Sequence, residues 1–252
     1  MIKGRVLVTG GNRGLGLQTC RELAERGYQV ILASRDIERG KAAAADLSGD
    51  VEVAELEVAS PAAIARLADS IGELFAVVNN AGASFDGFDA EIAAKTLQIN
   101  FFGAAAVADA LAPHVVDGGN IVMVSSGMGS ASCLSESLAA RFLSPDLSRE
   151  QLDALMNEYC ADIAAGEHER KGWPSNAYSV SKVGLNALTR VFARQHPRLR
   201  VTAVCPGWVR TDMGGPRASR DVEEGASGIV WAATRSEGDS GGIYRDGQRV
   251  GW

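Results

Sequence analysis

Residues 5–16 have the sequence RVLVTGGNRGLG, in which a short apolar run meets a glycine-rich turn that opens a helical pattern. Glycine lets the backbone turn tightly and approach a pyrophosphate, and the N-terminus of the following helix offers free N–H groups and a positive dipole end. Because the glycines stand between a predicted strand and a predicted helix, the segment predicts dinucleotide binding rather than a plain tight turn. The expected contacts are Gly10, Asn12, Arg13, Gly14, Leu15 and Gly16.

The alternation of strand and helix continues along the chain. Apolar runs predict strands at residues 5–9, 29–33, 51–58, 74–78, 120–124, 200–205 and 242–245. Helical patterns lie between them, over residues 15–26, 37–47, 90–111 and 176–195 and after the Ser60-Pro61 cap. Short buried strands that alternate with helices are typical of parallel sheets covered on both faces. We therefore predict one α/β domain over residues 1–252, a Rossmann-type, doubly wound fold with a mostly parallel, seven-stranded sheet.

Residues 130–173 interrupt this alternation, because no strand pattern occurs where a single helix is expected. The segment 148–151 is a capping box, Ser-Arg-Glu-Gln. The apolar residues after it share one helical face: Leu152, Leu155, Met156, Tyr159 and Ile163. We expect a helical insertion that packs against the body of the domain, as a stabilising flap, a substrate lid or an element that blocks oligomerisation.

Composition argues against several other classes of protein. A net charge of −6 and a pI near 5.2 do not suit a nucleic-acid-binding surface. No uncharged apolar run is long enough to span a membrane, and no leader pattern precedes the first strand. The four cysteines form no CxxC pair, which predicts reduced thiols and a cytoplasmic location. We expect no metal site.

The end of the second predicted strand distinguishes between the two nicotinamide dinucleotides. An acidic residue there would bind the ribose 2′-hydroxyl of NAD, whereas this sequence has Ser34-Arg35. A guanidinium suits the 2′-phosphate of NADPH, and Arg13 in the turn is a second candidate. Asp36, one residue further on, keeps NAD as the alternative, and Arg35 as a solvated surface charge is the other.

A tyrosine and a lysine at helical spacing supply candidate acid–base chemistry. Tyr178 and Lys182 stand four residues apart at the start of the helix 176–195, so both lie on one face. Tyrosine is a weak acid near neutral pH, with an ordinary pKa of about 10. A nearby ammonium and an oxidised nicotinamide both favour the phenolate, so we expect them to lower the pKa of Tyr178.

Polar residues follow two neighbouring predicted strands, where ligands bind in doubly wound sheets. Ser125 and Ser126 end the strand 120–124, and a hydroxyl there suits a hydrogen bond to a substrate oxygen. The segment 79–82, Asn-Asn-Ala-Gly, ends the strand before it. Asn100 lies in the next helix among apolar neighbours, so its amide must find partners. The amide either bonds a backbone carbonyl and a water that leads to Lys182, or it only braces its helix.

The chain resembles the short-chain dehydrogenases/reductases over nearly its whole length. The resemblance rests on motifs that occur in the same order as in that family: 9–16, 79–82, Asn100, Ser126, Tyr178, Lys182 and Pro206-Gly207. The resemblance implies that Ser126 polarises a carbonyl, Tyr178 is the acid or base, Lys182 binds the ribose and tunes Tyr178, and Asn100 holds a relay water. On the residues alone, Ser125 stays an alternative to Ser126. Further cofactor contacts implied are Glu57, Val58, Asn80, Ala81, Gly82, Pro206, Gly207, Val209 and Thr211. Glu57 stands where the family usually has an aspartate that touches the adenine.

Within that family, the segments 172–175 and 205–213 and the long insertion look like those of the monomeric carbonyl reductase subgroup. This likeness implies a monomer and a substrate pocket formed by Ser126, Met128, Trp208 and Met213, with Cys205 nearby. Ordinary core packing is the alternative for the three apolar residues and for Cys205.

Taken together, these residues predict NADPH-dependent reduction of a small-molecule ketone, aldehyde or quinone, with Tyr178 as general acid. The first alternative is an NAD-dependent alcohol dehydrogenase that reads the ribose with Asp36. The second is a catalytically silent sensor of NADP(H).

Overall fold

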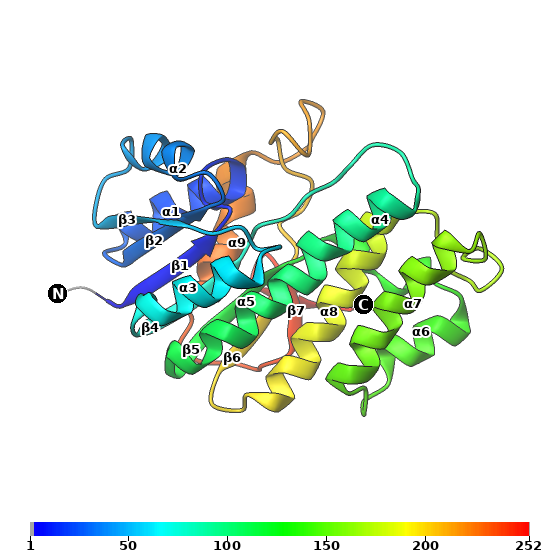
Figure 1. The fold of residues 1–252 in the computed structure, drawn as a ribbon. Helices are drawn as coiled ribbons and strands as arrows, with labels where there is room; N and C mark the ends of the chain where they lie inside the picture. Colours follow the sequence, from blue (N-terminus) through cyan, green and yellow to red (C-terminus); the bar gives the residue numbers. More distant parts are fainter. Residues whose placement is uncertain (1–2, 252) are drawn as a thin grey trace.

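An eight-stranded sheet runs through the computed structural model, which describes residues 3–251 (Figure 1). Its strands are β1 (Arg5–Thr9), β2 (Gln29–Ser34), β3 (Val51–Glu55), β4 (Leu74–Asn79), β5 (Val115–Val124), β6 (Arg200–Val204), β7 (Gly242–Arg245) and β8 (Gln248–Val250). Their order in the sheet is β3-β2-β1-β4-β5-β6-β7-β8, and every pair is parallel except β7–β8. The prediction of a Rossmann-like α/β fold with a mostly parallel sheet is confirmed.

The predicted number of seven strands is wrong, because β8 adds an antiparallel edge. Asp246 and Gly247 both have positive φ, 52° and 72°, and join β7 to β8 by a two-residue turn. Such turns match the twist of paired strands. The strand predicted at 51–58 is also too long, since β3 ends at Glu55, whereas β5 begins five residues before the predicted strand 120–124.

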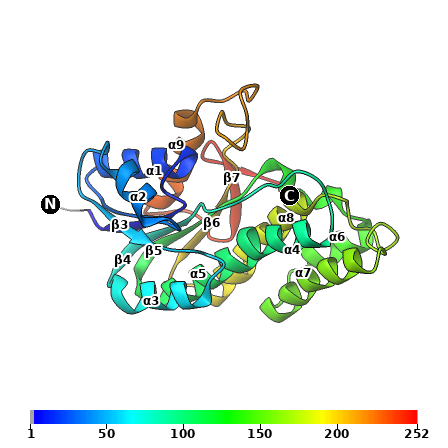
Figure 2. The same cartoon turned by 45° about the horizontal axis from the view of Figure 1, so that its top comes forward.

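Helices cover both faces of the sheet. One face carries α1 (Gly14–Glu25), α2 (Ile37–Ala44) and α9 (Val222–Thr234), and the other carries α3 (Pro61–Ile71), α4 (Ala90–Leu97), α5 (Ala104–Leu111) and α8 (Ala177–Gln195). The view in Figure 2 shows the sheet between these two layers. Each face buries its own apolar cluster, so both sides of the sheet contribute core. No helix within residues 3–251 is long and apolar enough to cross a membrane.

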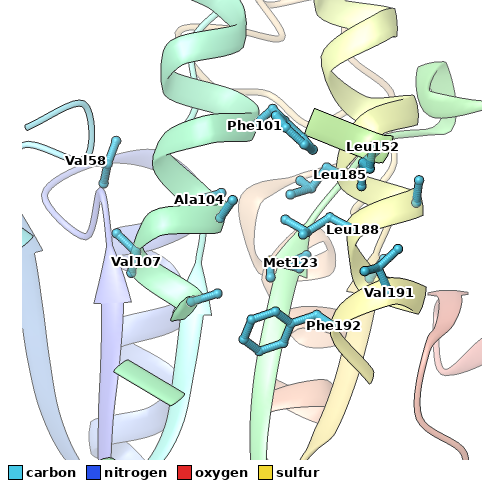
Figure 3. Close-up of a cluster of buried hydrophobic side chains, with 14 of the residues drawn as sticks. Val58, Phe101, Ala104, Val107, Met123, Leu152, Leu185, Leu188, Val191 and Phe192 are labelled. Atoms are coloured by element: carbon cyan, nitrogen blue, oxygen red, sulfur yellow. The ribbon is translucent and has the colours of Figure 1, made fainter. Parts of the chain in front are cut away.

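The core beneath α8 fixes the position of that helix. Figure 3 shows Leu185, Leu188 and Phe192 of α8 in one cluster with Met123 of β5 and Phe101. All five side chains are almost fully buried. At about 25 cal/mol per Å² of apolar surface, this burial stabilises α8 strongly against sliding or rotation. The residues at the N-terminal end of α8 therefore have a rigid support.

The long helix predicted at 90–111 contains a π-helical segment, Gln98–Gly103, between α4 and α5. Gly103 approaches the backbone so closely that a Cβ there would lie 2.7 Å from the Val58 carbonyl oxygen. A π segment inside an α-helix inserts an extra residue and often marks a functional position. Here it places Asn100 toward α8.

The insertion is helical, with α6 (Glu136–Leu143) and α7 (Arg149–Ala164) joined by a short connection. The predicted capping box at Ser148 and Gln151 is present, and the predicted apolar face of α7 is buried. This face packs against α4 and α8. Figures 1 and 2 show α6 and α7 beyond these helices, away from the sheet.

A buried carboxylate ties the end of the insertion to the segment before α8. Asp162 of α7 is 3% exposed, pairs with Lys171 and accepts a hydrogen bond of 3.0 Å from the indole N–H of Trp173. The Tyr159 hydroxyl donates to the Pro174 carbonyl at 3.2 Å. Charge-assisted bonds in a buried setting are strong, so residues 173–174 are held just before α8.

Replacing Asp162→Ala leaves the buried Trp173 indole N–H without its acceptor and Lys171 without its partner. We expect the free energy of unfolding to fall by about 3 kcal/mol, measured by urea titration followed by circular dichroism. The matched control is Glu158→Gln, which removes the carboxylate that pairs with Arg141. Because Glu158 is more exposed than Asp162, we expect this change to alter the free energy of unfolding by less than about 1 kcal/mol. Equal small losses for both variants would contradict the assigned role of Asp162.

Candidate active site

A cavity of about 620 Å³ opens where β5 and β6 end, at the carboxyl edge of the parallel sheet. This volume is within the range of small-molecule sites, and the edge is the usual ligand position in doubly wound folds. Its lining includes the four residues predicted for the substrate pocket, Ser126, Met128, Trp208 and Met213, and also Tyr178 and Cys205. The side chains predicted for binding and for chemistry therefore share one cavity.

The glycine turn between β1 and α1 is shaped by close backbone contacts. Gly10 and Gly14 have positive φ, 64° and 52°. A Cβ on Gly16 would lie 2.3 Å from the Gly10 carbonyl oxygen and 2.5 Å from Nδ2 of Asn80. Only glycine allows this approach, so α1 begins directly against the turn.

The side chain of Asn80, a residue predicted as a cofactor contact, braces the turn. Its Nδ2 donates to the Thr9 carbonyl at 2.8 Å and to the Gly10 carbonyl at 3.2 Å. The Thr9 hydroxyl in turn accepts from the backbone N–H groups of Asn80 and Ala81, at 3.0 and 2.9 Å. Thr9 was not among the predicted site residues, because its role depends on β4, which is distant in sequence.

The turn and the end of β2 fit a dinucleotide that carries a 2′-phosphate. The N-cap of α1 is Arg13, which makes no side-chain cap bond, so no side chain of the cap competes for the first N–H groups of the helix. Arg35 is exposed directly after β2, whereas Asp36 caps α2 by accepting from the N–H groups of Glu38 and Arg39. Asp36 is thus engaged by its own helix, and Arg35 is the cationic group nearest to the end of β2.

Two other predicted cofactor contacts already have local partners. The Glu57 carboxylate accepts from the Ala59 N–H at 3.1 Å, within the turn that follows β3. Arg13 forms an exposed ion pair of 2.9 Å with Asp212, in the loop after β6. Val58 is buried, and its backbone packs against Gly103. For Glu57 in particular, the carboxylate is engaged by the backbone.

The loop after β6 lies against the glycine turn. A Cβ on Gly14 would lie 3.3 Å from the methyl carbon of Thr211, and Val209 is buried beside Leu15 and Gly225. Pro206 and Gly207 begin this loop, and Gly207 has a φ of 83°. The predicted nicotinamide contacts Val209 and Thr211 are therefore close to the turn.

Gly82 lies between two of the predicted catalytic residues. A Cβ there would be 3.4 Å from Oδ1 of Asn100 and 3.8 Å from Nζ of Lys182. The missing side chain leaves space at this point, which suits a ligand group that contacts Lys182. Ala81, the residue before Gly82, packs against the core.

Tyr178, Ser126 and Lys182 form the reactive group of the site. Tyr178 lies in the first turn of α8, which Asn176 caps by accepting from the Ser179 N–H at 2.9 Å. The Tyr178 side chain and the Ser126 hydroxyl both line the cavity, and the Ser126 hydroxyl is close enough to influence the pKa of Tyr178. Lys182 is one turn further, with Nζ 5.6 Å from the centre of the Tyr178 ring.

The two adjacent serines have different partners. Ser125 is buried and donates to Oδ1 of Asn186 at 2.6 Å, which ties the end of β5 to the middle of α8. Ser126 is turned to Tyr178 instead, and its Oγ accepts from the Met128 N–H at 3.2 Å. Geometry thus distinguishes the two hydroxyls that the residues alone could not.

The pKa of Tyr178 is raised, whereas the neighbouring Lys182 was expected to lower it. Burial raises the pKa of Tyr178, while the hydrogen bond with Ser126 partly opposes this rise. Lys182 does not contribute because its Nζ donates to the Val124 carbonyl at 2.8 Å. Burial also lowers the pKa of Lys182 to about 8. An uncompensated charge in an apolar setting is costly, which explains both directions.

Asn100 links the loop after β4 to α8. Its Oδ1 accepts from the Ala83 N–H at 2.8 Å, and its Nδ2 donates to the Ala83 carbonyl at 2.9 Å and to the Ser181 hydroxyl at 3.1 Å. The backbone carbonyl foreseen as its partner is therefore that of Ala83. Asn100 therefore bonds Ser181, the residue before Lys182, rather than Lys182 itself.

The apolar residues of the predicted pocket are half exposed rather than packed in the core. Met128, Trp208 and Met213 are 50%, 54% and 52% exposed, and the Trp208 indole N–H donates to the Gly214 carbonyl. Cys205 is buried, with its sulfur near Gly127. Phe85 and Arg245 also line the cavity and were not predicted, since each comes from a segment without a motif.

The fold and site define a dinucleotide-dependent oxidoreductase class of protein. The family described as "short chain dehydrogenase" matches residues 4–138, and the one described as "Enoyl-(Acyl carrier protein) reductase" matches residues 146–231. The chain belongs to the short-chain dehydrogenase/reductase family, as its motifs predicted.

Several characterised relatives are similar over most of their length. Carbonyl reductase (NADPH) 1 of Homo sapiens is 38% identical over 250 residues, which cover 90% of this chain and 89% of that protein. The (+)-neomenthol dehydrogenase of Arabidopsis thaliana is 36% identical over 263 residues, 89% of each chain. The structure of salutaridine reductase from Papaver somniferum has a TM-score of 0.89 at 32% identity, covering 96% of this chain and 99% of that one.

The pKa of Lys182 predicts how activity depends on pH. Lys182 is protonated below a pH of about 8 and neutral above it, and only the protonated form stabilises a phenolate at Tyr178. We expect carbonyl reduction to be fastest below this pH and to decline as pH rises through it, measured as kcat/KM across a buffer series. The pKa of Tyr178 is raised above its ordinary value, so its own ionisation does not cause the decline.

Lys182→Arg is the control for this profile, because a guanidinium stays charged throughout the range. Its residual activity should lack the decline between about pH 7 and pH 9. The same decline in both proteins would contradict the assignment to Lys182.

Proposed function

We propose that this chain reduces the carbonyl group of a ketone, aldehyde or quinone to an alcohol, with NADPH as the reductant. The observation that carries the proposal is that Ser126 and Tyr178 share the wall of one cavity, with Lys182 one helical turn beyond Tyr178. Relatives that are named carbonyl reductase (NADPH) 1 are 35–38% identical to the chain, which supports the same reaction.

In this mechanism the chain supplies a proton and a polar environment. Bound NADPH supplies the hydride that reaches the carbonyl carbon. Tyr178 gives its hydroxyl proton to the carbonyl oxygen, and Ser126 donates a hydrogen bond to the same oxygen. The phenolate that Tyr178 becomes is stabilised by the charge on Lys182, and it regains a proton from solvent before the next cycle.

The surroundings of Tyr178 favour its protonated form. The raised pKa of Tyr178 keeps it protonated at neutral pH until a carbonyl arrives. The family resemblance implies that Lys182 binds the ribose and tunes Tyr178. Asn100 and Ser181 fix the wall next to Lys182 and so limit its movement.

The preference for NADPH is inferred from two neighbouring residues. Asp36 accepts two backbone N–H groups of α2 and pairs with Arg39, so it has little remaining capacity for a ribose hydroxyl. Arg35 carries an exposed guanidinium at the same strand end, which suits a 2′-phosphate. We propose Gly10, Asn12, Gly14, Leu15, Ala81, Gly82, Pro206, Val209 and Thr211 as further contacts, and no observation favours the NAD-dependent alternative.

The chain is also proposed to act as a monomer. The apolar face of α7 packs on α4 and α8, so these two helices are covered by the insertion rather than offered to another copy. The cytoplasmic location stays a prediction from the cysteine content.

Tyr178→Phe removes only the hydroxyl that donates the proton. We expect kcat to fall by about a thousandfold, while the Kd for NADPH, from fluorescence titration, changes by less than about twofold. The assay is NADPH oxidation with a panel of quinones, aromatic aldehydes and ketones. The control is Tyr28→Phe. Tyr28 directly precedes β2, at the amino end of the parallel strands, so both kcat and the Kd for NADPH should stay unchanged. Retained turnover in Tyr178→Phe would reject the assignment, and tight NADPH binding without any turnover in the wild type would favour the sensor.

Arg35→Ala tests the choice of cofactor. We expect the KM for NADPH to rise by about tenfold or more and the KM for NADH to change by less than about twofold, because only NADPH carries the 2′-phosphate. Arg66→Ala, an exposed residue of α3, is the control for loss of a surface cation. An equal rise for both cofactors, or a wild-type preference for NADH, would favour the NAD-dependent dehydrogenase.

A further inference from the structure

The cavity beside Tyr178 has one charged residue in the part of its wall that residues 3–251 form, and this is Arg245 at the end of β7. The remaining lining is neutral and includes no carboxylate. Lys182, whose ammonium bonds the Val124 carbonyl, lies behind the wall rather than in it. A guanidinium in a cavity without acidic residues gives that cavity a positive potential.

Among residues 3–251, the Arg245 guanidinium forms one ion pair, and that pair is long. Its nearest carboxylate is Asp246, 3.9 Å from Nε. Asp246 is already held by Arg220 through two bonds of 2.7 and 3.2 Å, a bidentate pairing that satisfies it. Within the described residues, the side chain of Arg245 makes no hydrogen bond, and it is 49% exposed. Its planar set of donors is therefore available to a ligand.

The position of Arg245 connects it to the reactive group. One of its terminal nitrogens lies beside Gly207, where a Cβ would be 3.3 Å away. Cys205 pairs with β7 through its N–H and the Tyr244 carbonyl at 2.8 Å. The Cys205 sulfur in turn lies 3.8 Å from the Cβ position of Gly127, the residue after Ser126. Arg245 thus belongs to the same cavity wall as Tyr178, and β6 separates its strand from β5, which ends next to Ser126.

The rest of the rim is apolar. Phe85, Met128, Trp208 and Met213 are each 42–54% exposed around the cavity, an unusual number of large apolar side chains in contact with solvent. An aromatic or otherwise bulky apolar body suits these residues, and an anionic group suits Arg245.

Resting on the proposed function, we propose that Arg245 selects carbonyl substrates that carry a carboxylate, with the apolar body of the substrate against the rim. The carbonyl oxygen lies at Ser126 and Tyr178 while the carboxylate pairs with the Arg245 guanidinium. Such a pairing is charge-assisted and planar, which suits arginine better than lysine.

The test compares meta- and para-formylbenzoate with their methyl esters, which keep the ring and aldehyde but lack the charge. For Arg245→Gln we expect kcat/KM to fall by about tenfold for the better of the two acids. The loss is moderate because a half-exposed charge pair is weaker than a buried one. The esters and the Kd for NADPH should change by less than about twofold. Arg245→Lys should recover part of the loss, and added salt should weaken the wild-type preference for the acid.

Arg249→Gln is the matched control, because Arg249 in β8 pairs with Asp239 and does not line the cavity. Equal losses for acid and ester in Arg245→Gln would overturn the proposal in favour of a structural role. A raised Kd for NADPH would overturn it in favour of a cofactor contact. In either case, wild-type reduction of the esters would leave the proposed function intact. No wild-type turnover of acids or esters would overturn both.

Discussion

Backbone polar groups at the ends of parallel strands must find hydrogen-bond partners, and in this protein the side chains that satisfy them also build the site. Thr9 and Asn80 join the ends of β1 and β4, and Ser125 with Asn186 joins β5 to α8. Lys182 serves the last carbonyl of β5. Because these bonds lie within the protein, the same contacts that end the strands also help to position the glycine turn and Lys182.

This arrangement has an energetic consequence for the catalytic pair. Lys182 is almost fully buried with one backbone acceptor, and its pKa falls to about 8. A lysine whose pKa is lowered by folding reduces stability at neutral pH, and this loss is relieved as pH rises above about 8 toward its unfolded value. The core under α8 supplies the compensating stability. A charged group can therefore be kept inside the fold, with its Nζ 5.6 Å from the centre of the Tyr178 ring.

Features that depend on neighbours in sequence were predictable, and features that depend on distant segments were not. The glycine turn and the spacing of Tyr178 and Lys182 are local patterns with a direct physical meaning. The eighth strand also had a local signal, the Asp246-Gly247 turn, but β8 is too short and polar to show a strand pattern. By contrast, the bracing role of Thr9 and the place of Arg245 in the cavity arise only when remote strands are brought together.

The insertion belongs to the same structural argument. Its buried carboxylate, Asp162, binds the indole of Trp173, and Tyr159 binds the Pro174 carbonyl. The chain then continues to Asn176, which caps α8 two residues before the proton donor Tyr178. A movable lid would need weak, exposed contacts, whereas these are buried in the core shared with α8. These contacts of the insertion with residues 173–174 support the N-terminal turn of α8.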